Sequence, residues 1–257
     1  MRQNKLRVTL LQTDITWMDM ELNRKNAELM LKEAPFSDIF ILPEMWNTGF
    51  VTFKYDFCQD DVLTWMREMA CKYDAALCGS LSVRDTCGDN YNRLYFVHPS
   101  GHVDFYDKRH LFGYGGEDKV YKAGGHRKVV CYKGLRFLIL TCYDLRFPVW
   151  SRNNDDYDAI IYVANWPESR QRVWDVLLRA RAIENQSYVL GCNRVGNDPE
   201  CSYAGGSVVV DSKGNVIAVA EGITPQIVYA ELDFCKQQAF REKFPVLADR
   251  DLFELNH

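Results

Sequence analysis

The chain has 257 residues, of which 47% are apolar and 26% charged, and its 31 basic and 35 acidic side chains give a formal net charge of −4. This composition excludes a disordered or fibrous chain, and the length allows a large hydrophobic core. The slightly acidic balance excludes the basic surface that attracts nucleic acids and anionic membranes, so we expect neither as a partner.

The cysteines indicate a reducing compartment. There are nine, an odd number without a C-x-x-C pair, which favours free thiols in the cytoplasm. They are Cys58, Cys71, Cys78, Cys87, Cys131, Cys142, Cys192, Cys201 and Cys235. No apolar segment with a cleavage site follows Met1, and no stretch approaches the roughly 18 apolar residues of a membrane span. We therefore expect a soluble intracellular protein.

Strand and helix patterns alternate in the first half of the chain. A helix is predicted at 23–32. Its apolar face carries Leu22, Leu29 and Met30. A second helix, at 61–74, is clearer because its apolar residues recur at intervals of three and four. Apolar runs predict strands at 6–12, 38–42, 75–83, 92–97 and 102–107.

After an irregular glycine-rich stretch at 112–126, strands dominate the second half. They are predicted at 128–132, 135–141, 158–164, 187–193, 207–210, 216–220 and 226–232, with helices at 170–186 and 233–244. No linker, repeat or low-complexity segment interrupts the pattern, so we expect one domain over residues 1–257. Because strands outnumber helices and several are joined by tight turns, we expect an α/β fold with a mixed sheet, or two sheets, covered by helices.

Two motifs look like ligand sites but lack residues that such sites need. His98 and His102 have an H-x3-H spacing, but no cysteine pair or second ligand pair supports a zinc site. The stretch 113–116 is glycine-rich, but neither a preceding strand nor a following Lys-Ser/Thr makes it a phosphate loop. No G-x-G-x-x-G follows a strand, which argues against a dinucleotide-dependent oxidoreductase. We therefore expect neither a zinc site at the histidines nor a phosphate-binding loop at the glycines.

Cys142 is the strongest candidate for a nucleophile. A buried strand ends at Thr141, and Pro148 suits the first turn of a helix. A strand–turn–helix bend would present the sulfur outside the sheet, and the positive end of the helix dipole would favour a thiolate. The alternative is that Cys142 is a small buried apolar residue, as cysteines often are.

A cysteine nucleophile needs a base. Histidine is the usual partner, but of the five histidines only His110 lies in a suitable loop. A buried carboxylate can serve instead, because burial raises its pKa toward neutrality, and Glu44 follows an apolar strand. Lys108 also ends a strand, and α/β sheets gather their sites at such ends, so these residues support one another. The alternative at each position is a solvated side chain.

The residues Glu44, Lys108 and Cys142, in this order, resemble the catalytic residues of the nitrilase superfamily of carbon–nitrogen hydrolases. They lie in Pro43-Glu44, in 106–112 (YDKRHLF) and in 142–148 (CYDLRFP). Three further stretches agree, at 164–167, 179–186 and 205–207, so the likeness covers nearly the whole chain. The sequence is most similar to the ω-amidase branch. Nitrilases usually have Trp-Glu after the cysteine, whereas this chain has Tyr143-Asp144, which favours an amide substrate.

The resemblance implies a four-layer α-β-β-α sandwich that forms a homodimer and needs no metal or organic cofactor. It implies hydrolysis of the ω-amide of a small 2-oxo acid, such as 2-oxoglutaramate or 2-oxosuccinamate. It also implies that Glu44 is the base for Cys142, and that Lys108 and the backbone N–H of Tyr143 hold the oxyanion. Glu117 matches a second glutamate that many members place beside these residues.

A small 2-oxo acid also needs a donor for its carboxylate. Arg146 is one candidate, and the alternative is a structural ion pair with Asp144 or Glu184. Tyr114 and Trp166 are expected to be walls of the pocket. Two other functions stay open: another amidase or N-carbamoyl amidohydrolase of the same superfamily, and a catalytically idle interaction module.

Overall fold

Two six-stranded sheets, each built around three parallel strands, form the centre of the molecule. The computed structural model describes residues 4–53, 55, 60–251, 253 and 254. The strand order of the first sheet is β14-β1-β2-β3-β4-β5, with β1, β2 and β3 parallel. Its strands are β1 (Lys5–Gln12), β2 (Ile39–Ile41), β3 (Ala76–Arg84), β4 (Asn90–Val97), β5 (Val103–Asp107) and β14 (Gln226–Asp233).

The second sheet repeats this plan with strands from the second half of the chain. Its order is β13-β12-β9-β8-β7-β6, with β7, β8 and β9 parallel. Its strands are β6 (Val129–Tyr132), β7 (Leu135–Thr141), β8 (Ala159–Ala164), β9 (Tyr188–Asn193), β12 (Val208–Val210) and β13 (Val216–Val219). A separate short hairpin, β10 (Val195–Asn197) with β11 (Ser202–Ala204), follows β9.

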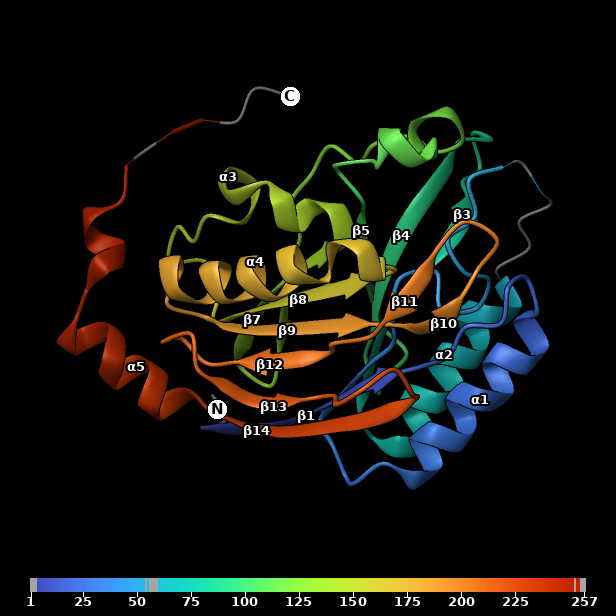
Figure 1. Ribbon diagram of the computed structural model, residues 1–257. Coiled ribbons are helices and arrows are strands. Elements are labelled where there is room, and N and C mark those ends of the chain that lie inside the picture. Colours follow the sequence, from blue (N-terminus) through green and yellow to red (C-terminus); the bar gives the residue numbers. More distant parts are fainter. Residues whose placement is uncertain (1–3, 54, 56–59, 252, 255–257) are drawn as a thin grey trace.

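The two sheets face each other, and helices cover their outer faces (Figure 1). The first sheet is covered by α1 (Met20–Glu33) and α2 (Asp60–Tyr73), and the second by α3 (Pro148–Ser151) and α4 (Gln171–Glu184). Short 3-10 helices lie in the connections: η1 (Gly113–Gly115), η2 (Glu117–Lys119), η3 (Cys142–Arg146), η4 (Glu168–Arg170) and η5 (Val246–Asp249). The α/β class and the four-layer α-β-β-α sandwich are thus confirmed.

Alternation along the central strands separates two apolar cores. In β2, Ile39 and Ile41 belong to the core between the sheets, whereas Phe40 belongs to the core under α1 and α2. Because both faces of each sheet are covered, the sequences of the central strands are nearly continuous apolar runs. Full burial of each large apolar side chain contributes about 1.5–3 kcal/mol, which makes a slip of one residue in the strand register costly.

The predicted face of the first helix is wrong for Leu22 and Leu29, whereas Met30 is partly buried against the core. The residues that α1 buries are Asn23, Ala27 and Leu31, whereas Leu22 and Leu29 are 39% and 57% exposed. The side-chain amide of Asn23 donates to the backbone carbonyl oxygens of Thr16 (2.7 Å) and Asn47 (2.9 Å). Since buried carbonyl groups require donors, these bonds hold a polar residue on the inner face that an apolar pattern cannot identify.

Most other predicted elements agree with the structure within a few residues. The strand β7 spans the predicted 135–141, and the helix predicted at 61–74 is α2. Its apolar face is buried as expected. The prediction missed the hairpin of β10 and β11, whose short strands lie among glycine, asparagine, aspartate and proline.

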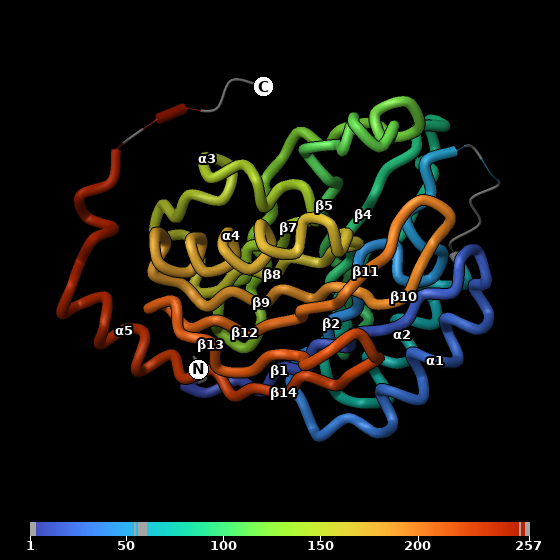
Figure 2. Tube along the Cα trace, in the orientation of Figure 1, coloured from blue at the N-terminus to red at the C-terminus, as the bar shows by residue number. Residues whose placement is uncertain are grey.

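The C-terminal helix α5 (Phe234–Lys243) lies along one side of the sandwich (Figure 2). Gln237 and Arg241 attach it, donating from their side chains to the backbone carbonyl oxygen of Gln186. In the described part of the chain, no helix is long and apolar enough to cross a membrane. Met1 and Cys58 lie outside the described residues, and the eight described cysteines are free thiols.

The strand directions bring several carboxyl ends together. In the first sheet β4 is antiparallel to both β3 and β5, so β5 runs in the direction of β2 and ends at the same edge. In the second sheet, the parallel strands β7 and β8 end beside that edge. The evidence is a hydrogen bond between Asn165, just after β8, and Glu44, which closely follows β2. Residues after four different strands therefore share one region.

Candidate active site

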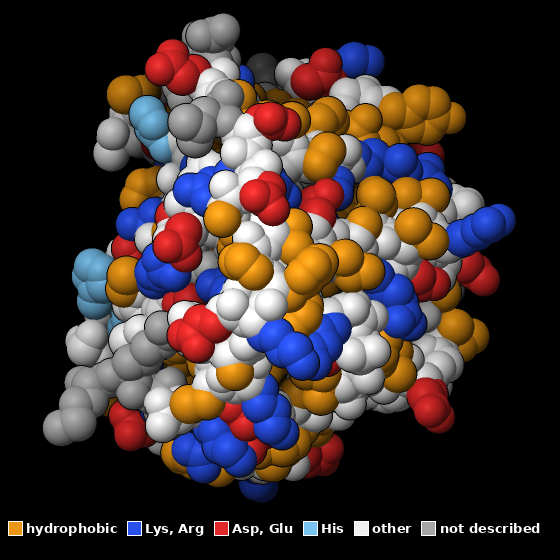
Figure 3. All heavy atoms as spheres, turned by 90° about the vertical axis from the view of Figure 1, so that its left-hand side faces the viewer, with side chains coloured by type: hydrophobic (Ala, Val, Ile, Leu, Met, Phe, Trp, Pro, Cys, Tyr) orange, Lys and Arg blue, Asp and Glu red, His pale blue; other side chains and the backbone are white. Residues whose placement is uncertain are grey.

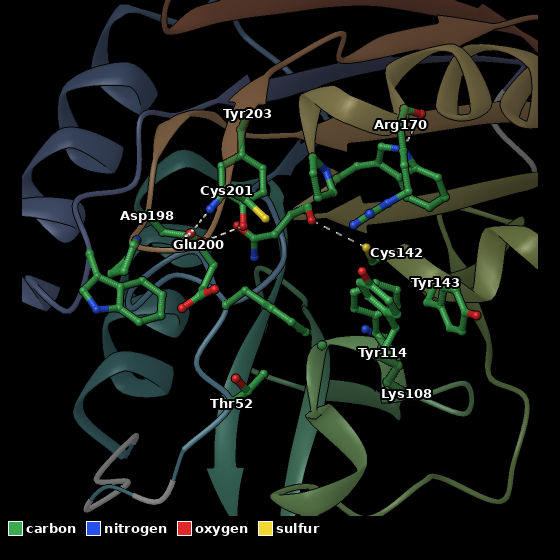
Figure 4. A pocket seen from close by; sticks show the side chains of 18 of the residues that line it. Thr52, Lys108, Tyr114, Cys142, Tyr143, Arg170, Asp198, Glu200, Cys201 and Tyr203 are labelled. Atoms are coloured by element: carbon green, nitrogen blue, oxygen red, sulfur yellow. Dashed lines mark hydrogen bonds between the residues drawn. The ribbon is translucent and has the colours of Figure 1, made fainter.

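Glu44, Lys108 and Cys142 meet at these carboxyl ends. Glu44 closely follows β2, while Lys108 comes directly after β5 and Cys142 directly after β7. Glu117, in η2, joins them, so the structure brings together all four side chains of the expected catalytic set. Cys142 is 8% exposed and lines a pocket together with Lys108 (Figure 4).

Cys142 occupies a sharp bend between β7 and η3. Its φ of +44° lies in the left-handed region, which is strained for any residue with a side chain. The thiol lies 3.9 Å from the backbone carbonyl oxygen of Asn165. Pro148 begins α3 as predicted, although a 3-10 helix that starts at Cys142 itself comes first. The expected strand–turn–helix bend is confirmed.

The Lys108 ammonium group joins the two glutamates. Its Nζ lies 2.8 Å from Glu44 Oε1 and 3.0 and 2.9 Å from the two carboxylate oxygens of Glu117. All three side chains are fully buried. An ammonium has three N–H donors. If one N–H bonds to each carboxylate, the third is available to a molecule in the pocket.

Two asparagines that we did not expect position Glu44. The side-chain amide of Asn92, on β4, donates to Oε1 of Glu44 (2.7 Å) and to Oε1 of Glu117 (2.9 Å). The backbone N–H of Asn165 donates to Glu44 Oε2 (2.8 Å), and its side-chain amide donates to the Glu44 carbonyl oxygen (2.6 Å). The stretch 164–167 contains Asn165, but the sequence assigns Asn92 no role, because it is one polar residue in a strand.

Burial and the neighbouring charges determine the protonation of the cluster. Burial raises the pKa of the Cys142 thiol well above its ordinary value, and the negative charge of Glu44 raises it further. Burial alone would lower the pKa of Lys108, but the carboxylates of Glu117 and Glu44 raise it above its ordinary value. Burial also raises the pKa of Glu117. Burial and the charge of Glu44 therefore disfavour the thiolate, whereas the charge of Lys108 favours it.

Asp144 links the bend at Cys142 to the end of β5, which Lys108 directly follows. Its buried carboxylate accepts hydrogen bonds from the Tyr106 hydroxyl (2.8 Å) and from the backbone N–H groups of Thr141 and His110 (3.0 Å each). His110 Nδ1 also lies 2.7 Å from it. His110 therefore supports the bend.

Replacing Asp144 by alanine should destabilise the fold by at least about 2 kcal/mol, because it leaves several buried donors without an acceptor. For a chain of this size that corresponds to a fall of roughly 4–8 °C in the midpoint of thermal unfolding. Asp61→Ala is the control, since Asp61 is exposed on α2. Equal midpoints for the two variants would contradict this role.

The cluster opens into a pocket of about 680 Å³. The other predicted binding residues line it: Tyr143, Tyr114, Arg146 and Trp166. Trp166 is buried, whereas Tyr114 is 92% exposed and forms part of the rim. Trp17, Phe50, Phe112, Arg170, Asp198, Glu200, Cys201 and Tyr203 are lining residues that we did not expect.

Arg146 does not form the ion pair that we considered for it. Asp144 bonds to Tyr106 and His110 instead, and Glu184 pairs with Arg181 (3.0 Å). The Arg146 guanidinium lies 5.2 Å from the centre of the Trp166 ring. The structure therefore favours the alternative in which Arg146 serves the pocket.

The two histidines of the H-x3-H motif lie at the other end of β4 and β5. Asp104 lies beside them, which the sequence did not suggest. Among the described residues, these three form the only cluster of at least three His, Cys, Asp or Glu side chains that are close enough together to bind one metal ion. Asp104 also pairs with Lys128 Nζ at 2.6 Å. That positive charge weakens the attraction of the group for a cation.

Comparisons with known proteins agree with this geometry. The family model described as carbon-nitrogen hydrolase matches residues 7–242. The chain is 46% identical to "Omega-amidase YafV" of Escherichia coli, over 97% of this chain and 98% of that protein. It is 35% identical to "2-oxoglutaramate amidase" of Bacillus subtilis, over 97% of this chain and 100% of that one.

A solved structure from Xanthomonas campestris is similar along its whole length. It is described as a CN-hydrolase superfamily protein with an arsenic adduct in the active site. The TM-score is 0.94 and the identity 37%, over 99% of this chain and 100% of that one.

Proposed function

The chain belongs to the carbon–nitrogen hydrolase family, and we propose that it hydrolyses the ω-amide of a small 2-oxo acid, such as 2-oxoglutaramate or 2-oxosuccinamate, releasing ammonia. The observation that carries the proposal is the buried cluster in which Lys108 joins two glutamates beside a pocket thiol. The cluster supplies a nucleophile, a base and an oxyanion donor at one pocket.

In the first half-reaction, Glu44 takes the proton of the Cys142 thiol as the sulfur attacks the amide carbonyl carbon. Because the resting thiol has a raised pKa, proton transfer accompanies attack. The oxyanion accepts hydrogen bonds from Lys108 Nζ and from the backbone N–H of Tyr143. A donor of this kind contributes several kcal/mol of transition-state stabilisation. Glu44 then passes its proton to the leaving nitrogen, and ammonia departs from a thioester.

In the second half-reaction, Glu44 takes a proton from water as the water oxygen attacks the thioester carbonyl. The C–S bond breaks, the carboxylic acid forms, and Glu44 returns its proton to the sulfur. Asn92 and Asn165 keep the Glu44 carboxylate oriented in both steps. Glu117 holds the Lys108 ammonium in place and is a positioning residue.

The pocket also offers groups for the rest of the substrate. Arg146 supplies a guanidinium for the substrate carboxylate, and Trp166 and Tyr143 form apolar walls, with Tyr114 at the rim.

The test of the proposed function is ammonia release from 2-oxoglutaramate, glutamine, an N-carbamoyl amino acid and a nitrile. A best substrate other than a 2-oxo amide would contradict the proposal. Preference for the N-carbamoyl amino acid would instead support the alternative function, an N-carbamoyl amidohydrolase.

We further propose a cytoplasmic homodimer of one domain per chain. Free thiols at all eight described cysteines suit a reducing compartment. Apolar residues on the outer face of α3 and α4, Val149, Val176 and Ile183, are 51%, 56% and 55% exposed and offer a surface for a second copy. On the face that carries α5, charges of both signs and apolar side chains are intermixed (Figure 3). Sedimentation equilibrium of the purified protein tests the dimer, and a monomer at micromolar concentration would contradict it.

A further inference from the structure

A second arginine, Arg170, lies in the active-site pocket. It is the last residue of η4 and immediately precedes α4, and its side chain extends from there toward Cys142 (Figure 4). Its guanidinium is 5.1 Å from the centre of the Phe112 ring. Arg170 is partly exposed, as is Arg146. Two positive groups therefore line the pocket that holds the nucleophile.

Neither arginine has a carboxylate partner among the described residues. Other arginines of the chain form ion pairs with carboxylates: Arg93 with Asp107 (2.6 Å), Arg127 with Asp156 (2.5 Å) and Arg136 with Asp158 (3.1 Å). An uncompensated pair of guanidinium groups in a concave, partly apolar site attracts an anion.

The acidic residues on the opposite rim do not neutralise this pair. Asp198 already accepts the backbone N–H groups of Glu200 (2.8 Å) and Cys201 (2.7 Å), and the Tyr203 hydroxyl (2.5 Å). Glu200 is exposed.

The backbone holds Arg170 in place. Trp166 Nε1 donates to the carbonyl oxygen of Arg170 (2.9 Å), and the N–H of Arg170 donates to the carbonyl oxygen of Pro167 (3.0 Å). The same short turn begins at Asn165, which bonds to the catalytic Glu44. The backbone of Arg170 is thus fixed relative to the reacting groups before a substrate arrives, which lowers part of the entropic cost of binding.

We propose that Arg170, with Arg146, binds the carboxylate at the end of the substrate opposite the amide, and that Arg170 selects anionic amides over neutral and zwitterionic ones. A planar guanidinium can form two parallel hydrogen bonds to a carboxylate. An α-ammonium group, as in glutamine, would approach two like charges, which disfavours it against a 2-oxo group. This assignment rests on the proposed function, because it names the group that recognises the acid end of that substrate.

The experiment compares Arg170→Gln with Arg172→Gln, whose arginine is exposed on α4 and does not line the pocket. The first readout is inhibition of pentanamide hydrolysis by glutarate, a dianion of similar length. We expect the inhibition constant to rise about 10- to 100-fold in Arg170→Gln and to be unchanged in Arg172→Gln. The second readout is the ratio of kcat/KM for 2-oxoglutaramate to that for pentanamide, which should fall by the same factor, mainly through KM.

The outcomes separate this inference from the proposed function. Unchanged glutarate inhibition and an unchanged ratio in Arg170→Gln would overturn the role of Arg170, even if the wild type hydrolyses 2-oxoglutaramate well. Equal loss of kcat/KM for the charged and the neutral amide would also overturn it, since a structural role affects both. A wild type that ignores 2-oxoglutaramate, yet loses glutarate inhibition on substitution of Arg170, would overturn the proposed substrate and support the anion site.

Discussion

Replacing Cys142 by alanine should lower kcat for ammonia release from 2-oxoglutaramate by at least about 10⁴-fold, because it removes the proposed nucleophile of the covalent half-reaction. The residual rate would come from binding and oxyanion stabilisation alone. Alanine also suits the small buried site, and the hydrogen bonds that Asp144 accepts from Tyr106, His110 and Thr141 do not involve the sulfur. Ammonia release measured with excess enzyme, together with the midpoint of thermal unfolding, checks both points.

Cys201→Ala is the matched control, because Cys201 is a second described thiol that lines the pocket. It contributes no group to the cluster in which Lys108 joins Glu44 and Glu117. We expect kcat to stay within about twofold of the wild type. Full activity in Cys142→Ala, or its loss in Cys201→Ala alone, would contradict the assignment of the nucleophile.

Those parts of the site that depend on a short local sequence pattern could be predicted from the sequence. The bend at Cys142 could be predicted from a strand that ends at Thr141 and from Pro148 soon afterwards. The order of Glu44, Lys108 and Cys142 along the chain then identified the family. The glycines at 205 and 206 have φ values of +75° and +74°, and a side chain at either would meet Gln12 or Gln171 within 3 Å. Their presence in the motif is therefore a backbone requirement.

The features that escaped prediction depend on contacts between distant segments. Asn92 touches Glu44 and Glu117 only because β4 lies beside β3 and β5. Arg170 enters the pocket because β8 and η4 bring it there, and nothing distinguishes it from Arg172 in the sequence. The inner face of α1 follows Asn23 rather than Leu22 and Leu29, because buried carbonyl groups required a donor. Local periodicity carries no information of this kind.

Replacing Lys108 by methionine should lower kcat/KM by at least about 10³-fold, because it removes the proposed oxyanion donor and the group that bonds to both glutamates. Lys119→Met is the control, since Lys119 is exposed in η2 of the same connection. The substitution should also destabilise the fold by about 3–5 kcal/mol at pH 8, because it leaves two buried carboxylates without their cation.

This loss of stability should depend on pH in a defined direction. The pKa of Glu117 is already raised by burial, and removal of Lys108 raises it further, because the lysine charge is what lowers it. A carboxyl group whose pKa is higher in the folded than in the unfolded chain adds stability below its ordinary value of about 4.3, and that stability is lost as pH rises through the folded pKa. Urea unfolding should therefore show a smaller deficit at pH 5 than at pH 8.

The double variant Lys108→Met/Glu117→Gln separates stability from catalysis. It removes one of the two uncompensated charges, so it should recover most of the stability at pH 8, and the pH dependence of the deficit should shrink. Activity should stay low, because the oxyanion still lacks its ammonium donor. A deficit equal at pH 5 and pH 8 would contradict the charge argument, and recovery of kcat/KM in the double variant would contradict the catalytic role of Lys108.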